Sequence, residues 1–199
     1  TGHVYRAMNN ADAALNAYSR AIQINPALFA SFRAQIDILS ATGRESVTGP
    51  LKRQLESLEA LPKVLVGVMD LIAHGKLVKA EELCKGFMQK VPRHIEGMRL
   101  LADIGNRLGV LEDAEFLLES AIEFSPDSIQ VRIDYIQVLR KRQKYEEALA
   151  QAKLLLDKDP KNPQFQSVFA IESMQSGDYD TALQTFDSIL QIIPEDPGT

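Results

Sequence analysis

Apolar residues in the segment AEFLLESAIEF recur at intervals of three and four positions, with charged residues between them. Four of them fall on one face of a helix: Ala114, Leu117, Leu118 and Ala121. This spacing predicts an amphipathic helix whose apolar face packs against neighbouring elements. Proline ends a helix because it has no N–H and clashes with the preceding turn. We therefore expect this helix to end before Pro126.

Proline and alanine recur with a period of 34 residues along most of the chain. The period is marked by Pro92, Pro126, Pro160 and Pro194, and Pro26 lies 66 residues before Pro92. Twelve residues before each of these five prolines stands an alanine: Ala14, Ala80, Ala114, Ala148 and Ala182. Seventeen residues before them stand Asn9, Gly75, Gly109, Gln143 and Gly177. The chain is therefore built from internal repeats.

Each of these residue types has a physical role in a pair of helices joined by a turn. Glycine and asparagine suit the turn because they tolerate a positive φ at low cost. The small alanine lets the two helices approach closely, whereas a larger side chain would push them apart. Each repeat is thus predicted to hold a first helix, a tight turn and a second helix that ends at the proline. We call these helices A and B.

Two stretches, GNRLGVLEDAEFLLESAIEFSPDS and SGDYDTALQTFDSILQIIPED, carry this pattern and resemble the tetratricopeptide repeat (TPR). The resemblance extends over nearly the whole chain. It implies an all-α protein, an α-solenoid whose TPR helix-turn-helix repeats stack into a right-handed superhelix of about twelve helices. It also implies a concave surface lined by the A helices.

The repeat register predicts two parts of the chain. Residues 1–60 form an N-terminal part with one truncated and one degenerate TPR, and an irregular joint lies near residues 45–60. Residues 61–196 hold four regular TPR repeats: 61–94, 95–128, 129–162 and 163–196. Residues 197–199 begin a further, truncated repeat, and Thr1 falls inside an A helix. We therefore expect the sequence to be a segment of a longer array.

The degenerate repeat, residues 29–60, departs from the pattern in helix B. Thr48 takes the alanine position, and Pro50 stands where helix B should already be running. We therefore expect a loop over residues 45–50 and a short, displaced helix over residues 51–60. This joint is predicted to be a hinge between the two parts.

Composition and charge narrow the function classes. Hydrophobic residues make up 45% of the chain, enough to bury a core, and the net charge of −5 argues against a nucleic-acid partner. The single Cys84 cannot form an internal disulfide, which favours a reducing compartment and a cytoplasmic location. The most apolar stretch, LPKVLVGVMDLIAHG, is broken by Asp70, so we expect no membrane span.

No catalytic or metal-binding constellation stands out in the sequence. His3, His74 and His94 are scattered and lack the i, i+4 partner of a zinc helix. Cys84 occupies an apolar position of helix B, which favours a core role over a nucleophilic one. The glycines form neither a G-x-G-x-x-G motif nor a phosphate loop. We therefore expect no enzyme activity in this segment, and neither a cofactor nor a metal.

The TPR resemblance assigns partner binding to the A helices, mainly to positions 2, 5, 9, 12 and 13 of a repeat. In repeats 95–128 and 129–162, these positions supply the polar groove residues Arg99, Asp103, Asn106, Arg107, Gln130, Gln137, Arg140 and Lys141. The corresponding stretch of repeat 61–94 is apolar and supplies Leu65, Met69 and Ile72.

Two interpretations of this groove stay open. In the first, the polar residues are a solvated face, and the displaced helix 51–60 covers the apolar strip. In the second, the four cations and Asn106 hold an acidic or extended peptide of a partner protein, and the apolar strip is an anchor pocket. Arginine and asparagine suit this role because they hydrogen-bond carboxylates and peptide backbone with defined geometry. The sequence therefore predicts a non-catalytic protein–protein interaction scaffold.

Residues 99–183, from RLLADIGNRLG to GDYDTAL, are also similar to the N-terminal TPR array of bacterial TPR-containing sulfotransferases. That similarity implies a catalytic domain outside this chain that uses 3′-phosphoadenosine-5′-phosphosulfate, with these repeats recruiting substrate or self-associating. The Gly-, Ser- and Thr-rich phosphosulfate loop of such a domain does not occur in this sequence, so no residue here inherits a catalytic role. A repeat stack that only forms a homodimer is a third hypothesis.

Overall fold

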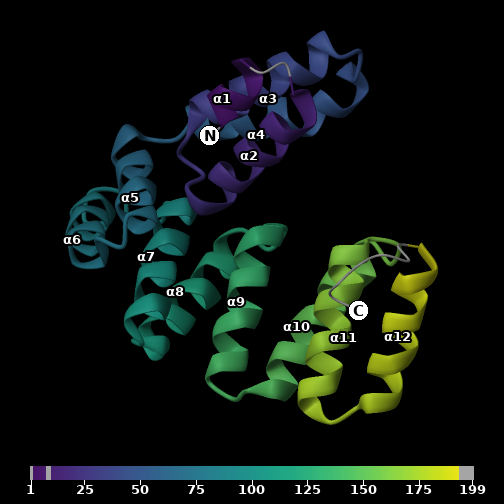
Figure 1. The fold of residues 1–199 in the computed structure, drawn as a ribbon. Helices are drawn as coiled ribbons and strands as arrows, with labels where there is room; N and C mark the ends of the chain where they lie inside the picture. The colour runs from purple at the N-terminus through teal and green to yellow at the C-terminus, as the bar shows by residue number, and fades with distance from the viewer. Residues whose placement is uncertain (1, 8–9, 193–199) are drawn as a thin grey trace. The chain divides into compact units, whose positions relative to one another are not determined.

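The computed structural model describes residues 2–7 and 10–192, which form helices joined by short turns, without a strand (Figure 1). The first elements are α1 (Gly2–Ala7), α2 (Ala11–Ile24), α3 (Phe29–Ala41), the 3-10 helix η1 (Glu45–Val47) and α4 (Thr48–Glu59). The next are α5 (Lys63–Ala73), α6 (Leu77–Met88), α7 (Ile95–Leu108) and α8 (Leu111–Phe124). The last are α9 (Ile129–Lys141), α10 (Tyr145–Lys158), α11 (Pro163–Ser176) and α12 (Tyr179–Ile192). The predicted all-α fold class is confirmed.

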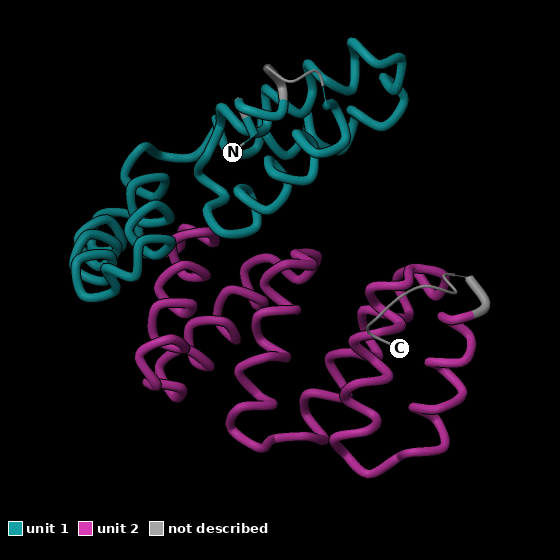
Figure 2. Tube along the Cα trace, in the orientation of Figure 1, with its two compact units in different colours: residues 1–92 teal, residues 93–199 magenta. Residues whose placement is uncertain are grey.

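The chain forms two compact units, residues 1–92 and residues 93–199 (Figure 2). In the first unit, α1 to α4 pack in chain order and α5 packs against α6. In the second unit, each helix from α7 to α12 packs against the next. The four A helices α5, α7, α9 and α11 begin at the predicted repeat starts or two residues after them. The predicted hinge lies inside the first unit and stays a prediction.

The turn between helices A and B has a left-handed backbone in each of the four regular repeats. Gly75, Gly109 and Gly177 have φ values of 69°, 82° and 92°, and Gln143 has a φ of 60°. Glycine adopts this conformation without steric strain, whereas the Cβ of Gln143 crowds the backbone. The predicted turns are therefore confirmed in these repeats. Asn9, the equivalent residue of the first repeat, lies outside the described residues.

The recurring alanines of the B helices are buried, as a close approach of two helices requires. None of the five exposes more than 3% of its surface: Ala14, Ala80, Ala114, Ala148 and Ala182. Between α7 and α8, a Cβ built on Gly105 would lie 3.5 Å from the Cβ of Ala114 and 3.3 Å from the carbonyl oxygen of Val110. The two helices therefore cross so closely that small residues are needed on both.

The degenerate repeat differs from its prediction at the start of helix B. The expected loop over residues 45–50 is wrong, because η1 occupies residues 45–47 and α4 begins at Thr48. Pro50 lies in the first turn of α4, where a missing N–H costs no helical hydrogen bond. Thr48 is 2% exposed, and its hydroxyl donates to the carbonyl oxygen of Glu45 over 2.8 Å. Threonine thus fills the alanine position with its polar group satisfied.

The core of the second unit passes from one repeat to the next. One buried cluster joins α9, α10 and α11, and its large members are Ile136, Leu139, Leu155 and Phe165. In this unit α9 packs against α8 and α11 packs against α10, so the apolar faces of successive repeats merge. The polar residues of the A helices are therefore left on another side of those helices.

Candidate functional site

The A helices α7 and α9 carry the polar residues that the sequence assigns to a groove. These helices belong to the second unit and contact each other. We call the following residues the A-helix surface: Glu96, Arg99, Asp103, Asn106 and Arg107 on α7, and Gln130, Asp134, Gln137, Arg140 and Lys141 on α9. Along each helix, successive members are three or four positions apart, except for one adjacent pair near its C-terminal end. The residues of each helix therefore share one side.

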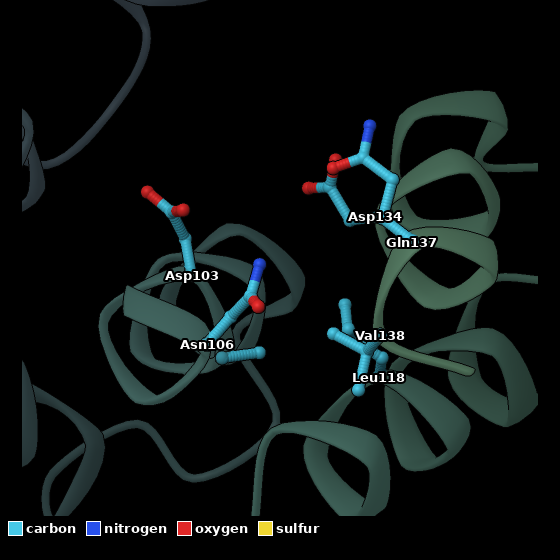
Figure 3. Close-up of a pocket in the computed structure, with 7 residues that line it drawn as sticks. Asp103, Asn106, Leu118, Asp134, Gln137 and Val138 are labelled. Atoms are coloured by element: carbon cyan, nitrogen blue, oxygen red, sulfur yellow. The ribbon is translucent and has the colours of Figure 1, made fainter. Parts of the chain in front are cut away.

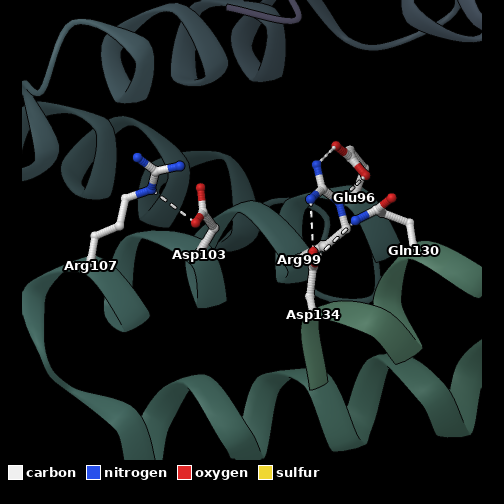
Figure 4. Close-up of polar contacts among 6 residues, drawn as sticks. All are labelled: Glu96, Arg99, Asp103, Arg107, Gln130 and Asp134. Carbon is white, nitrogen blue, oxygen red and sulfur yellow. Dashed lines mark hydrogen bonds and ion pairs between the residues drawn. The ribbon is translucent and has the colours of Figure 1, made fainter. Parts of the chain in front are cut away.

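At the start of the two helices, Arg99 of α7 binds Glu96 of its own helix and Asp134 of α9 (Figure 4). It donates from Nε and Nη2 to Glu96 at 2.8 and 2.6 Å, and from Nη1 to Asp134 at 2.9 Å. Gln130 donates to the other oxygen of Asp134 at 2.9 Å. These four residues are the Arg99 cluster. All three nitrogens of the guanidinium are engaged, and only 17% of the Arg99 side chain is exposed.

Burial and charge act in opposite directions within the Arg99 cluster. Burial raises the pKa of Asp134, although Arg99 and Gln130 lower it in part. For Arg99, burial favours loss of the charge, but Glu96 and Asp134 outweigh burial and raise the pKa of the guanidinium. Arg99 therefore stays charged, and the cluster is a closed structural link between two repeats.

The last turns of α7 and α9 are more open. Arg107 donates from Nε to Asp103 at 2.9 Å, and 51% of its side chain is exposed (Figure 4). Lys141 donates from Nζ to Oδ1 of Asn106 at 2.7 Å. This bond links α9 to α7 but leaves the lysine charge unbalanced, because an amide is neutral.

Arg140 extends the surface toward α11 through an ion pair with Glu172. Both its Nε and its Nη2 donate to Oε1 of Glu172. Glu172 is fully buried, and its Oε2 has no partner among the described residues. Glu172 is not among the residues that the sequence predicts for the groove. It occupies the repeat position at which Ile104 and Val138 are buried, and an acid in an apolar position indicates a cation nearby.

A small hollow lies between α7 and α9 (Figure 3). Asp103 and Asn106 border it from α7, and Asp134 and Gln137 border it from α9. Apolar side chains complete its lining: Ala102, Leu118 and Val138. Its space for water-sized molecules is about 20 Å³, enough for about one water and far below the several hundred Å³ of a small-molecule pocket. The hollow is therefore too small to enclose a cofactor, and a ligand would lie across its opening.

The helix pairs and their buried alanines agree with the comparison with known families. The cytochrome c-type biogenesis protein H TPR domain matches residues 85–199, more than half of the chain. The chain belongs to this TPR family. The tetratricopeptide repeat family also matches residues 2–28. No curated protein matches the chain.

Solved TPR structures share the fold at low sequence identity. YrrB, described as a TPR protein with an unusual peptide-binding site, has a TM-score of 0.60 and 16% identity, over 93% of this chain and 96% of YrrB. MamA from Desulfovibrio magneticus RS-1 has a TM-score of 0.60 and 13% identity, over 67% of this chain and 76% of MamA. A TPR protein from Parabacteroides merdae ATCC 43184 has a TM-score of 0.57 and 14% identity, over 96% and 76%. These likenesses show a TPR solenoid.

The predicted apolar strip of the TPR groove lies in the core. Leu65 is 0% exposed, Met69 6% and Ile72 7%. Side chains with so little exposed surface are not open to a partner. We therefore leave them out of the A-helix surface, and the anchor pocket stays a sequence-based hypothesis.

The described part of this TPR chain offers no cluster of three or more His, Cys, Asp or Glu side chains that could hold a metal ion. Within the same residues, none of the helices combines the length and the apolar character needed to cross a membrane. Cys84 is buried, as a core position predicts. The polar A-helix surface is therefore the feature from which we argue function.

Proposed function

We propose that this TPR chain is a non-catalytic protein–protein interaction scaffold whose A-helix surface binds an extended segment of a partner protein. The hollow between α7 and α9 carries this proposal. It is lined by the amides of Asn106 and Gln137 and by the apolar side chains of Leu118 and Val138. An amide can donate to a peptide carbonyl and accept from a peptide N–H. Two amides on neighbouring helices could therefore hold a backbone that runs across them.

The amide of Gln137 is available for such a contact. The residue is exposed, and its side chain forms no hydrogen bond with any described residue. By contrast, Gln130 on the same helix already donates to Asp134. YrrB, a TPR protein of this fold with an unusual peptide-binding site, supports a peptide as the ligand class.

The charges of the surface favour backbone recognition over a uniformly acidic ligand. The surface has four cations, Arg99, Arg107, Arg140 and Lys141. They are matched by its three carboxylates, Glu96, Asp103 and Asp134, and by the buried Glu172 of α11. The two sets balance, so the surface as a whole provides no strong positive field. Hydrogen bonding by amides is then the main source of affinity.

Selection from a random peptide library on the whole chain tests the proposal. Affinities of the selected peptides would be measured by fluorescence anisotropy with the wild-type chain and with Asn106→Ala and Gln137→Ala. We expect each variant to lose about fivefold in affinity, because one hydrogen bond is worth about 1 kcal/mol.

Gln184→Ala is the matched control, since Gln184 is an exposed glutamine on the B helix α12. The control should bind like the wild type, and circular dichroism should show the same helix content in all variants. If Gln137→Ala and Gln184→Ala bind the peptides with equal affinity, the A-helix surface is not the binding site. Because the family takes its name from a protein of c-type cytochrome biogenesis, proteins of that process are the first natural partners to try.

The sulfotransferase context, the homodimer and the cytoplasmic location stay predictions. Detecting the native polypeptide in its source cells tests the sulfotransferase hypothesis: a product well above 22.1 kDa would be followed by an assay of sulfate transfer. Sedimentation at two protein concentrations tests the homodimer. Fractionation of the same cells tests the cytoplasmic location.

A further inference from the structure

Lys141 is a cation whose charge no carboxylate of the described residues balances. Its Nζ donates to the neutral amide of Asn106 at 2.7 Å, and it forms no ion pair within the described part of the chain. The side chain is exposed at the end of α9. An ammonium group has three N–H donors, so two remain for a further acceptor.

Arg107 provides further donors at the end of the neighbouring helix α7. It directly follows Asn106, the residue that Lys141 contacts, and lies in the last turn of α7. Only its Nε is engaged, with Asp103, while neither Nη group forms a hydrogen bond with a described residue. The helix dipole favours cations at a helix C-terminus, but this preference does not use up their donors.

The Arg99 cluster shows that not every cation of this surface can take a new ligand. Arg99 uses Nε, Nη1 and Nη2 within the protein, on two carboxylates (Figure 4). Arg140 is bound to the buried Glu172. Lys141 and Arg107 are therefore the most open cations of the surface, and Asn106, which Lys141 contacts, borders the hollow.

We propose that Lys141 and Arg107 form a subsite for the side-chain carboxylate of an Asp or Glu in the bound segment. This inference rests on the proposed function and adds the chemistry of one partner residue to it. A carboxylate has two oxygens and accepts charge-assisted hydrogen bonds from both an ammonium and a guanidinium. The amides of the hollow would hold the backbone beside it.

A double-mutant cycle between the chain and a library-selected peptide tests the subsite. Each Asp or Glu of the peptide is changed in turn to Asn or Gln, and each peptide is titrated with the wild-type chain and with Lys141→Gln. We expect one acid-to-amide change to weaken binding about fivefold to the wild type and by less than twofold to Lys141→Gln. Arg107→Gln should show the same coupling, and the wild-type affinity should fall as salt rises.

Lys153→Gln is the control, because Lys153 is an exposed lysine on the B helix α10 without an ion pair among the described residues. With Lys153→Gln, each acid-to-amide change of the peptide should weaken binding by the same factor as with the wild-type chain. If peptides bind but no acid-to-amide change couples to Lys141, the subsite is wrong while the proposed function stands. If affinity depends only on the peptide's C-terminal carboxylate, tested with amidated peptides, the side-chain assignment is wrong. If no peptide binds the wild-type chain, both proposals fail.

Discussion

The two ends of the A-helix surface contain similar residues but differ in how their charges are used. At the start of α7 and α9, the guanidinium of Arg99 is enclosed by Glu96 and Asp134, and 17% of its side chain is exposed. At the end of the same helices, Arg107 uses one nitrogen, and 51% of its side chain is exposed. A groove cation can therefore be a link between repeats or a donor for a partner, and its residue type does not distinguish the two.

The largest expected effect follows from the closed end. Changing Arg99 to Met keeps an apolar stem but leaves Asp134, whose side chain is only 19% exposed, without its cation. Removing one member of a buried ion pair is strongly destabilising, so we expect the free energy of unfolding to fall by about 3 kcal/mol. Urea unfolding followed by circular dichroism measures this loss.

Arg107→Met is the matched comparison on the same helix. Its ion pair with Asp103 is exposed, so the variant should stay within about 0.5 kcal/mol of the wild type. Similar losses for the two variants would show that the ends of the surface do not differ as the structure implies.

The turns after α7 and α9 give a smaller contrast of the same kind. Gly109 and Gln143 occupy equivalent turns with φ values of 82° and 60°. Gln143→Gly should raise the free energy of unfolding by about 0.5 to 1 kcal/mol, because it removes the steric strain of a Cβ at a left-handed backbone position. Gly109→Ala should lower the free energy of unfolding by about 1 kcal/mol, because it introduces a Cβ at such a position. Urea midpoints of the two variants against the wild type measure both changes.

Gly86→Ala separates this turn effect from the general cost of glycine. Gly86 lies inside α6, and a Cβ there would meet no atom within 4 Å. Alanine should stabilise that helix by about 0.5 kcal/mol. If Gly86→Ala and Gly109→Ala change stability in the same direction, the left-handed turn is not the cause.

Much of the TPR fold could be predicted from the sequence because local rules determine it. The spacing of Gly75, Gly109 and Gly177 located three turns, and the recurring alanines located the helix crossings. The loop predicted from Pro50 is wrong because proline breaks a helix interior but is tolerated in a first turn. Deciding between these cases required knowing where α4 begins.

The binding surface was less predictable because it depends on contacts between repeats. The sequence identified Arg99, Arg107, Arg140 and Lys141 as one group of cations. Their partners lie up to 35 positions away, as Asp134 and Asn106 do, so the register between neighbouring helices decides which charges are balanced. The repeat period predicts which helices are neighbours, but it does not specify the rotamer that joins one side chain to another.

The smallest expected effect is a difference in pH dependence between two buried carboxylates. Burial raises the pKa of Asp134 above its ordinary 3.8. Burial also acts to raise the pKa of Glu115 on α8, but its hydrogen bonds from Lys144 at 2.7 Å and Arg142 at 2.5 Å outweigh burial and lower it below 4.5. Asp134 therefore has a higher proton affinity in the folded protein than in the unfolded chain, and Glu115 has a lower one.

The two carboxylates should change stability in opposite directions as the pH rises. The contribution of Asp134 declines as the pH rises through the window above 3.8, since the folded state there holds a proton that the unfolded chain has lost. The contribution of Glu115 is present above pH 4.5 and is lost as the pH falls through the window below it. With urea unfolding measured across this range, Asp134→Asn should gain on the wild type as the pH rises, and Glu115→Gln should fall behind it. If the stabilities of both variants relative to the wild type change in the same direction with pH, Arg99 controls the charge of Asp134 more strongly than burial does.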